Sequence, residues 1–161
     1  MKFPKLNILT LFEIPTYDIF KNNHAKYLTL EDWDDESDVV KALKELGHRV
    51  TIHGISNNID ELIDKVRSEK PDIVFNLCES YNRQRHLEPN ICALLELLQT
   101  PYTGCSSQTL QLCKNKGLQK KILSYHNIKI PEFEIISITR NLDKKLRNFK
   151  FPAIVKPLTK D

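Results

Sequence analysis

A nearly unbroken apolar run, Ile73-Val74-Phe75-Asn76-Leu77, is the feature that most constrains how this chain can fold. A strand with one face in water alternates apolar and polar residues, whereas a strand covered by helices on both faces is apolar almost throughout. Two more candidate strands, residues 6–11 and 49–53, are separated from it and from each other by stretches that include segments of helical period. The sequence therefore predicts an α/β fold of three layers, in which helices cover both faces of a mostly parallel sheet.

Helix-start and helix-stop residues divide the intervals between these strands. The first helix opens on an acidic run, which suits a positive helix N-terminus, and stops at Gly47. The second begins at Asn58, which forms a capping pair with Glu61, and the third starts near Pro89 and finishes before Pro101. The apolar face expected for the first helix consists of Val39, Val40, Leu43 and Leu46.

Beyond Pro101 the predicted elements are shorter. A strand at Pro101-Tyr102-Thr103 leads to Gly104, one helix starts at Ser106 or Ser107, and the next is capped by Asn115. Further candidates are a strand at residues 133–136, a helix at residues 142–149 and a closing strand from Ala153 to Lys156.

One long stretch, residues 12–34, fits neither helical nor strand period. It carries the aromatic residues Tyr17, Phe20, Tyr27 and Trp33, and a connection of this length is either functional or mobile. Both alternatives stay open from the sequence.

Composition excludes several classes of protein. The 161 residues carry a net charge of +3, with scattered lysines, which argues against a nucleic-acid-binding surface. No window is long and apolar enough for a membrane span, and the N-terminus lacks the pattern of a secretory signal. We therefore expect a cytoplasmic protein without nucleic-acid or membrane partners.

Cysteine and histidine spacing predicts no metal site. The four cysteines form no Cys-x-x-Cys pair, and we expect reduced, mostly buried thiols. The five histidines show no ligand spacing either, so each is expected to be a surface residue or a satisfied core residue. Cys78, beside Glu79 at a strand end, has no histidine placed by the sequence to activate it, which favours a buried structural thiol over a nucleophile.

Candidate chemistry lies in the loops that follow the strands, because ligands of open parallel sheets bind at the carboxyl ends of the strands. These loops contain Glu13, Glu79 and the turn Gly104-Cys105-Ser106-Ser107. No glycine-rich phosphate loop is present, which argues against an ordinary dinucleotide fold. Lys114 and Lys116 lie at a helix start, where the macrodipole disfavours a cation by roughly 0.3 to 1 kcal/mol. They are either solvated surface lysines, or one of them faces an anion.

Five segments, in order and spacing, resemble the D-alanine:D-alanine ligase-like branch of the ATP-grasp superfamily. They are Leu94-Leu95-Glu96-Leu97-Leu98, Pro101-Tyr102-Thr103-Gly104, Asn115-Lys116-Gly117-Leu118-Gln119-Lys120-Lys121, Ile130-Pro131 and Phe151-Pro152-Ala153-Ile154-Val155-Lys156-Pro157. The resemblance implies a Rossmann-like pre-ATP-grasp domain over residues 1–126. It also implies the first strands of a truncated ATP-grasp nucleotide-binding domain over residues 127–161.

The resemblance also implies a reaction. Members of this family use ATP and Mg²⁺ to convert a carboxylate into an acyl phosphate, which an amine then attacks. The two lysines that contact the nucleotide phosphates in the family correspond to Lys116 and Lys156. The expected partners are small-molecule carboxylate and amine substrates, with a homodimer as a candidate assembly.

This chain departs from the family in the segments expected to bind substrate and in the residues expected to bind the metal ion. Ligases that join two D-alanines carry a glycine pair after the first strand and a His-Gly after the third, where this chain has Phe12-Glu13-Ile14-Pro15 and Cys78-Glu79-Ser80. Glu13 and Glu79 could bind a substrate amine or be ordinary loop carboxylates. The family's metal-binding residues and glycine-rich lid would follow Asp161, so this chain alone is expected to be inactive. The alternative is a non-catalytic α/β module that binds a small molecule or a protein.

Overall fold

The computed structural model describes residues 4–21, 23–137 and 149–159. The chain divides into two compact units, Met1–Gln108 and Thr109–Asp161. The strands are β1 (Asn7–Glu13), β2 (Arg49–Ile55) and β3 (Ile73–Asn76), and the α-helices are α1 (Asp34–Glu45), α2 (Ile59–Glu69), α3 (Glu88–Leu97), α4 (Ser107–Lys114) and α5 (Lys116–Tyr125). Three short 3-10 helices, η1 (His24–Thr29), η2 (Glu31–Trp33) and η3 (Arg85–Leu87), complete the described elements.

The sheet is parallel, with the strand order β2-β1-β3. Leu11 of β1 lies opposite His53 of β2 and Asn76 of β3, which sets the register of both ladders. The strand expected at residues 101–103 is reduced to one parallel bridge between Tyr102 and Val74. In this bridge, Val74 N donates to Pro101 O at 2.8 Å and Thr103 N donates to Val74 O at 2.9 Å.

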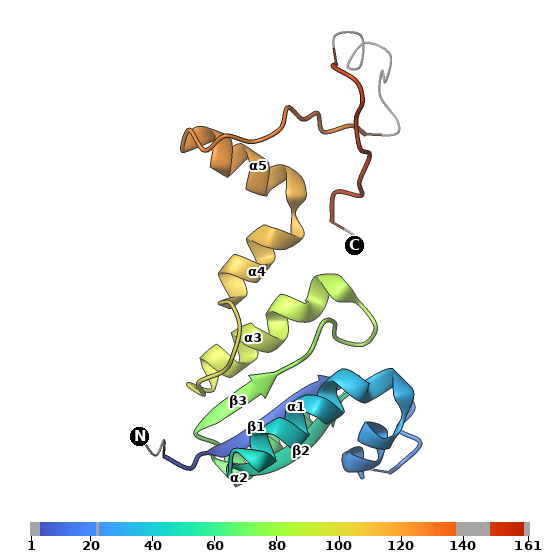
Figure 1. The fold of residues 1–161 in the computed structure, drawn as a ribbon, viewed down its shortest axis with the longest axis vertical. Coiled ribbons are helices and arrows are strands. Elements are labelled where there is room, and N and C mark those ends of the chain that lie inside the picture. Colours follow the sequence, from blue (N-terminus) through green and yellow to red (C-terminus); the bar gives the residue numbers. More distant parts are fainter. Residues whose placement is uncertain (1–3, 22, 138–148, 160–161) are drawn as a thin grey trace. The chain divides into compact units, whose positions relative to one another are not determined.

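Helices cover both faces of this sheet, as the apolar strand pattern predicts. On one face the core consists chiefly of Leu9, Leu11, Val74, Leu62, Val66, Ile91 and Leu95, which join β1 and β3 to α2 and α3. Phe12 follows Leu11 along β1 and therefore points to the opposite face, where η1 and η2 pack. Helix α1 lies in front of the strands in Figure 1 and contacts β2 and η1. The predicted three-layer α/β class is confirmed.

The aperiodic stretch after β1 is packed against the sheet. Phe12, Ile14 and Tyr27 are buried and form a second core with Trp33 and other partly buried side chains. Trp33 Nε1 donates to Glu13 O at 3.0 Å, and Tyr27 OH donates to Asp18 Oδ1 at 2.9 Å. Helical or strand period is absent here because short 3-10 turns, rather than an α-helix or a strand, present these aromatic side chains.

Most predicted helix ends are found where the capping residues place them. Asn58 Oδ1 caps the helix by accepting from Asp60 N at 3.1 Å, and Asn58 Nδ2 donates to Glu61 Oε1 at 2.8 Å, so the predicted pair meets through its side chains. Gly47 adopts a φ of 86° after α1, in the left-handed region that glycine occupies without strain. The prediction for Leu46 is wrong, because this side chain lies just beyond the end of α1 and is 72% exposed.

In the second unit, the strands predicted at residues 133–136 and 153–156 are absent; both segments are irregular. A strand needs a hydrogen-bonded neighbour, and no ladder forms among the described residues of this unit. The chain instead returns to α5, where Lys116 N donates to Leu158 O at 3.1 Å. The helix predicted at residues 142–149 lies almost wholly outside the described residues.

Candidate functional site

Glu13 ends β1 at the carboxyl edge of the sheet, where the loop after β3 also begins. Ser80 Oγ donates to Glu13 Oε2, and the backbone N of Arg83 donates to Glu13 Oε1 at 2.9 Å. The side chain of Ser80 is buried, so its hydroxyl needs this acceptor. One carboxylate therefore ties the loop after β3 to the end of β1.

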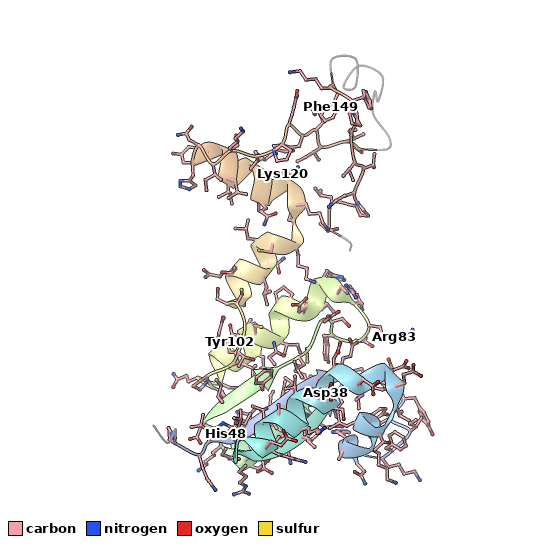
Figure 2. All side chains as sticks on the ribbon, in the orientation of Figure 1. Asp38, His48, Arg83, Tyr102, Lys120 and Phe149 are labelled. Carbon is pink, nitrogen blue, oxygen red and sulfur yellow. The ribbon has the colours of Figure 1, made fainter. Side chains whose placement is uncertain are left out.

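The loop held by Glu13 contains a tight turn. Tyr81 and Gln84 form an antiparallel bridge around it, and Figure 2 labels Arg83 on this loop between β3 and α3. Asn82 and Arg83 have φ values of 49° and 60°, a conformation that costs free energy for residues other than glycine. The hydrogen bond from Arg83 N to Glu13 stabilises this turn at the edge where a ligand is expected.

Glu79, the second carboxylate predicted in this loop, is placed differently from Glu13. Its side chain is 76% exposed and pairs with the Arg85 guanidinium at 3.2 Å. An exposed pair of this kind contributes little to stability. Glu13 is thus engaged within the loop, whereas Glu79 faces solvent.

The cysteines fall into two groups. Cys78 and Cys92 are buried, whereas Cys105 and Cys113 are exposed, so the expectation of mostly buried thiols holds for only two of them. Burial raises the pKa of Cys78 well above its usual range and that of Cys92 to about 11. Both buried thiols are therefore protonated at neutral pH, in agreement with a structural role for Cys78.

Lys116 and Lys156, the two predicted phosphate ligands, belong to the same compact unit. Lys116 is the first residue of α5 and is half-buried, and Asn115 Oδ1 caps the helix by accepting from Leu118 N at 2.9 Å. Lys156 is exposed. It lies two residues before Leu158, whose carbonyl oxygen accepts from Lys116 N at 3.1 Å. Two extended residues span roughly 7 Å, so the structure brings both lysines to the start of one helix.

Gly117 permits this close approach. A Cβ added there would lie 2.6 Å from Cδ1 of Ile135 and 2.8 Å from Cδ1 of Leu158. Glycine is therefore the residue that lets both side chains close over the first turn of α5.

Glu96 was missed by the sequence analysis. It accepts from Ser107 N at 2.9 Å and Ser107 Oγ at 2.6 Å, and from Tyr102 OH at 2.5 Å. These hydrogen bonds, led by that from the Ser107 hydroxyl, lower the pKa of Glu96. The carboxylate thereby holds the Gly104 turn to the end of α3, a role that helical or strand periodicity does not predict.

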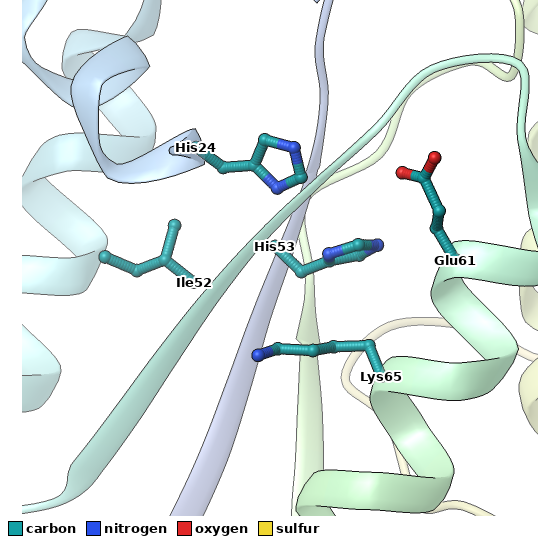
Figure 3. Close-up of a pocket in the computed structure, with 5 residues that line it drawn as sticks. All are labelled: His24, Ile52, His53, Glu61 and Lys65. Carbon is teal, nitrogen blue, oxygen red and sulfur yellow. The ribbon is translucent and has the colours of Figure 1, made fainter. Parts of the chain in front are cut away.

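A second cluster, also not anticipated, lies at the β2 edge (Figure 3). His24, Ile52, His53, Glu61 and Lys65 line an open hollow of about 270 Å³. The His24 and His53 rings are buried with centroids 5.1 Å apart, and the Nε2 atoms of both lack a hydrogen-bond partner. Burial lowers the pKa of His53 to about 4, so this ring is neutral at physiological pH. Residues 24 and 53 are too far apart in sequence for spacing to reveal the pair.

Neither the contacts of Glu96 nor the hollow beside His24 and His53 has the composition of a metal centre. Across the described ranges, no three His, Cys, Asp or Glu side chains are grouped so that they could hold a metal ion. Among the helices of the same ranges, none is both long and apolar enough to cross a bilayer.

Comparison with known proteins points to one family. The chain is 25% identical over 114 residues to D-alanine–D-alanine ligase A of Clostridium perfringens and 27% identical over 121 residues to a D-alanine–D-alanine ligase of Clostridium botulinum. Two crystal structures of D-alanine–D-alanine ligase from Bacillus anthracis, one of them complexed with ATP, superimpose with TM-scores of 0.70 and 0.63 at 18% and 17% identity. In sequence and in fold this chain resembles D-alanine–D-alanine ligases. The resemblance predicted from the sequence is confirmed.

The match to these ligases covers part of each relative. The aligned regions include 66% and 74% of this chain but only 38% of each Clostridium ligase, and 92–96% of this chain but 45–46% of the Bacillus structures. This chain therefore spans less than half the length of the ligases it matches. No protein-family model matches the chain.

Proposed function

We propose that this chain is the N-terminal portion of an ATP-dependent carboxylate–amine ligase that works through an acyl phosphate. The observation that carries the proposal is the similarity of this chain, with its parallel three-stranded sheet, to D-alanine–D-alanine ligases in both sequence and fold. The Bacillus ligase complexed with ATP supports a nucleotide as the shared cofactor.

In this proposal Lys116 and Lys156 contact the nucleotide phosphates. A cation about 4 Å from a phosphate oxygen gains on the order of 4 kcal/mol at an effective dielectric near 20, before the cost of desolvation. Two lysines also neutralise charge that would repel an incoming carboxylate. Mg²⁺ would complete the site in the whole ligase, with ligands supplied by other parts of that protein.

Substrate recognition is assigned to the carboxyl edge of the sheet. The substrates are a small carboxylic acid and a small amine, with Glu13 and Glu79 as proposed contacts for the amine. Glu79 is the more accessible of the two, because both carboxylate oxygens of Glu13 already accept hydrogen bonds within the loop. The proposal also includes a boundary between domains near residue 126. It further includes a homodimeric assembly and a cytoplasmic location.

Titration of the isotopically labelled chain with ATP tests the nucleotide site directly. We expect weak binding, with amide shifts at the start of α5 and around Lys156, and no turnover in the presence of Mg²⁺ and amino acids. Lys116→Ala and Lys156→Ala should each weaken binding by about tenfold or more, since each removes a charged phosphate contact. Lys121→Ala, which removes a cation from the same helix, is the matched control and should leave the affinity within about twofold.

Two results would count against the proposal. Equal losses in the Lys121→Ala control and the Lys116→Ala variant would indicate non-specific charge attraction instead of a site. If ATP shifted only amide signals in other regions of the chain, Lys116 and Lys156 could not be assigned as contacts of the nucleotide.

A further inference from the structure

His24 ties the segment after β1 to the outer edge of β2. The backbone N of Gly54 donates to His24 Nδ1 at 2.9 Å, and the ring is only 6% exposed. A Cβ at Gly54 would lie 3.3 Å from His24 Cγ and 2.5 Å from Ile14 Cγ2, so glycine allows this close contact. The hydrogen bond satisfies a backbone donor of an edge strand that has no further strand beside it in the described sheet.

The direction of this hydrogen bond determines the protonation state of His24. Gly54 N–H is a donor, so Nδ1 must be unprotonated and neutral His24 carries its proton on Nε2. A second proton would place an N–H group on Nδ1, facing the N–H of Gly54. The contact therefore exists only while His24 is neutral. The same tautomer keeps Nε2 from ligating a metal ion, because its lone pair is replaced by a proton.

Charged groups approach His24 from several elements. In the connection between β1 and η1, Asp18 Oδ2 lies 3.6 Å from His24 Nε2, and α2 contributes Glu61 and Lys65 to the hollow beside it. From β2 the neutral His53 ring packs edge-to-face against it. The two carboxylates favour a charged His24, whereas Lys65 and burial oppose it. Burial is the largest effect, so the pKa of His24 lies below its usual value.

We propose that His24 is a proton-operated latch, which holds the segment His24–Trp33 against β2 while neutral and releases it when protonated. On protonation the Nδ1 contact with Gly54 becomes repulsive, while Nε2–H gains a stronger attraction to Asp18, which precedes the released segment in the connection after β1. Both changes favour movement of the ring away from the strand. Release exposes the hollow beneath His24 and the outer edge of β2.

Hydrogen exchange of the Gly54 amide measures the latch. The protection factor of this amide is its intrinsic exchange rate divided by its measured rate. At pH values below the ordinary histidine pKa, we expect this factor to decrease by up to about tenfold per pH unit, because opening takes up one proton. The amides of β1 report global unfolding and should lose less protection over the same range. Exchange at Gly54 that follows β1 throughout would overturn the proposal.

Two variants separate the latch from general acid sensitivity. His24→Asn places an amide oxygen near the position of Nδ1, so Gly54 keeps an acceptor that does not titrate and its protection should no longer fall in acid. Asp18→Asn removes a carboxylate that favours the charged ring and should shift the fall to lower pH. The same acid response in His24→Asn as in the wild type would exclude His24 as the titrating group.

A third measurement does not depend on any variant folding. The ¹⁵N chemical shifts of the wild-type imidazole ring report which nitrogen carries the proton. We expect an unprotonated Nδ1 and a protonated Nε2 in His24 near pH 7.5. The opposite tautomer would overturn the proposal.

Discussion

At the scale of single residues, two carboxylates in neighbouring loops have opposite environments. Glu13 accepts from the buried Ser80 hydroxyl and from Arg83 N, whereas Glu79 makes one exposed ion pair. We expect Glu13→Gln to lower the free energy of unfolding of the first unit by about 1–3 kcal/mol, because two hydrogen bonds to a charged carboxylate become weaker bonds to a neutral amide. Glu79→Gln, the matched control, should cost less than about 1 kcal/mol.

Urea unfolding followed by the fluorescence of Trp33 measures both changes, since the Trp33 indole donates to the Glu13 carbonyl group. A loss for Glu79→Gln as large as that for Glu13→Gln would refute the assignment of Glu13 as the residue that holds the loop.

At the scale of elements, α2 and α5 each begin with an asparagine whose side-chain oxygen caps the helix. Asn58 caps α2 through Asp60 N, and Asn115 caps α5 through Leu118 N. Loss of an asparagine cap costs about 1 kcal/mol, or roughly fivefold in an opening equilibrium. We expect Asn115→Ala to accelerate amide exchange in α5 by about this factor and to leave α2 unchanged, while Asn58→Ala does the reverse. Equal effects of either variant on both helices would show that the two units unfold together.

At the scale of the whole molecule, burial is concentrated in one unit. Within the described ranges every buried large apolar side chain belongs to the first unit, and Gly117 is the buried residue of α5. Local stability follows buried apolar contacts, so we expect amides of β1 to exchange at least about tenfold more slowly than those of α5. Low urea should accelerate exchange in β1, which needs global unfolding, more than in α5. Comparable protection in both elements would contradict a second unit of low stability.

Much of the fold was predictable because its signals are local. The apolar run at residues 73–77 predicts a strand buried on both faces, and the cap residues Asn58 and Asn115 predict helix starts that the structure confirms. Leu46 shows the limit of periodicity, since an apolar residue in phase with a helix is exposed once the helix has ended. The prediction of a closing strand at residues 153–156 was wrong for a related reason, because a sequence with strand propensity forms no ladder without a neighbouring strand.

The candidate site was predictable to a smaller extent. Glu13, Glu79, Lys116 and Lys156 were located from strand ends and from family resemblance, and their roles as ligand contacts stay predictions. Their environments could not be predicted, because the partners are distant in sequence: Ser80 lies 67 residues from Glu13, and Gly54 lies 30 residues from His24. A similar distance concealed the pair His24 and His53. The contacts of Glu96 with Tyr102 and Ser107 span only 6 and 11 residues, but they cross an irregular turn, which has no helical or strand period to predict them.

The sequence by itself determined the class of this protein, since strand period, helix caps and motif order all depend on neighbours along the chain. Only the tertiary structure decided which polar groups are satisfied, because hydrogen bonds and burial depend on neighbours in space. That difference explains why Glu13 and Glu79, each two residues beyond the end of a predicted strand, acquire different roles: Glu13 holds a loop and Glu79 is exposed to solvent. It also explains why a histidine within an aperiodic segment becomes the acceptor for an edge strand.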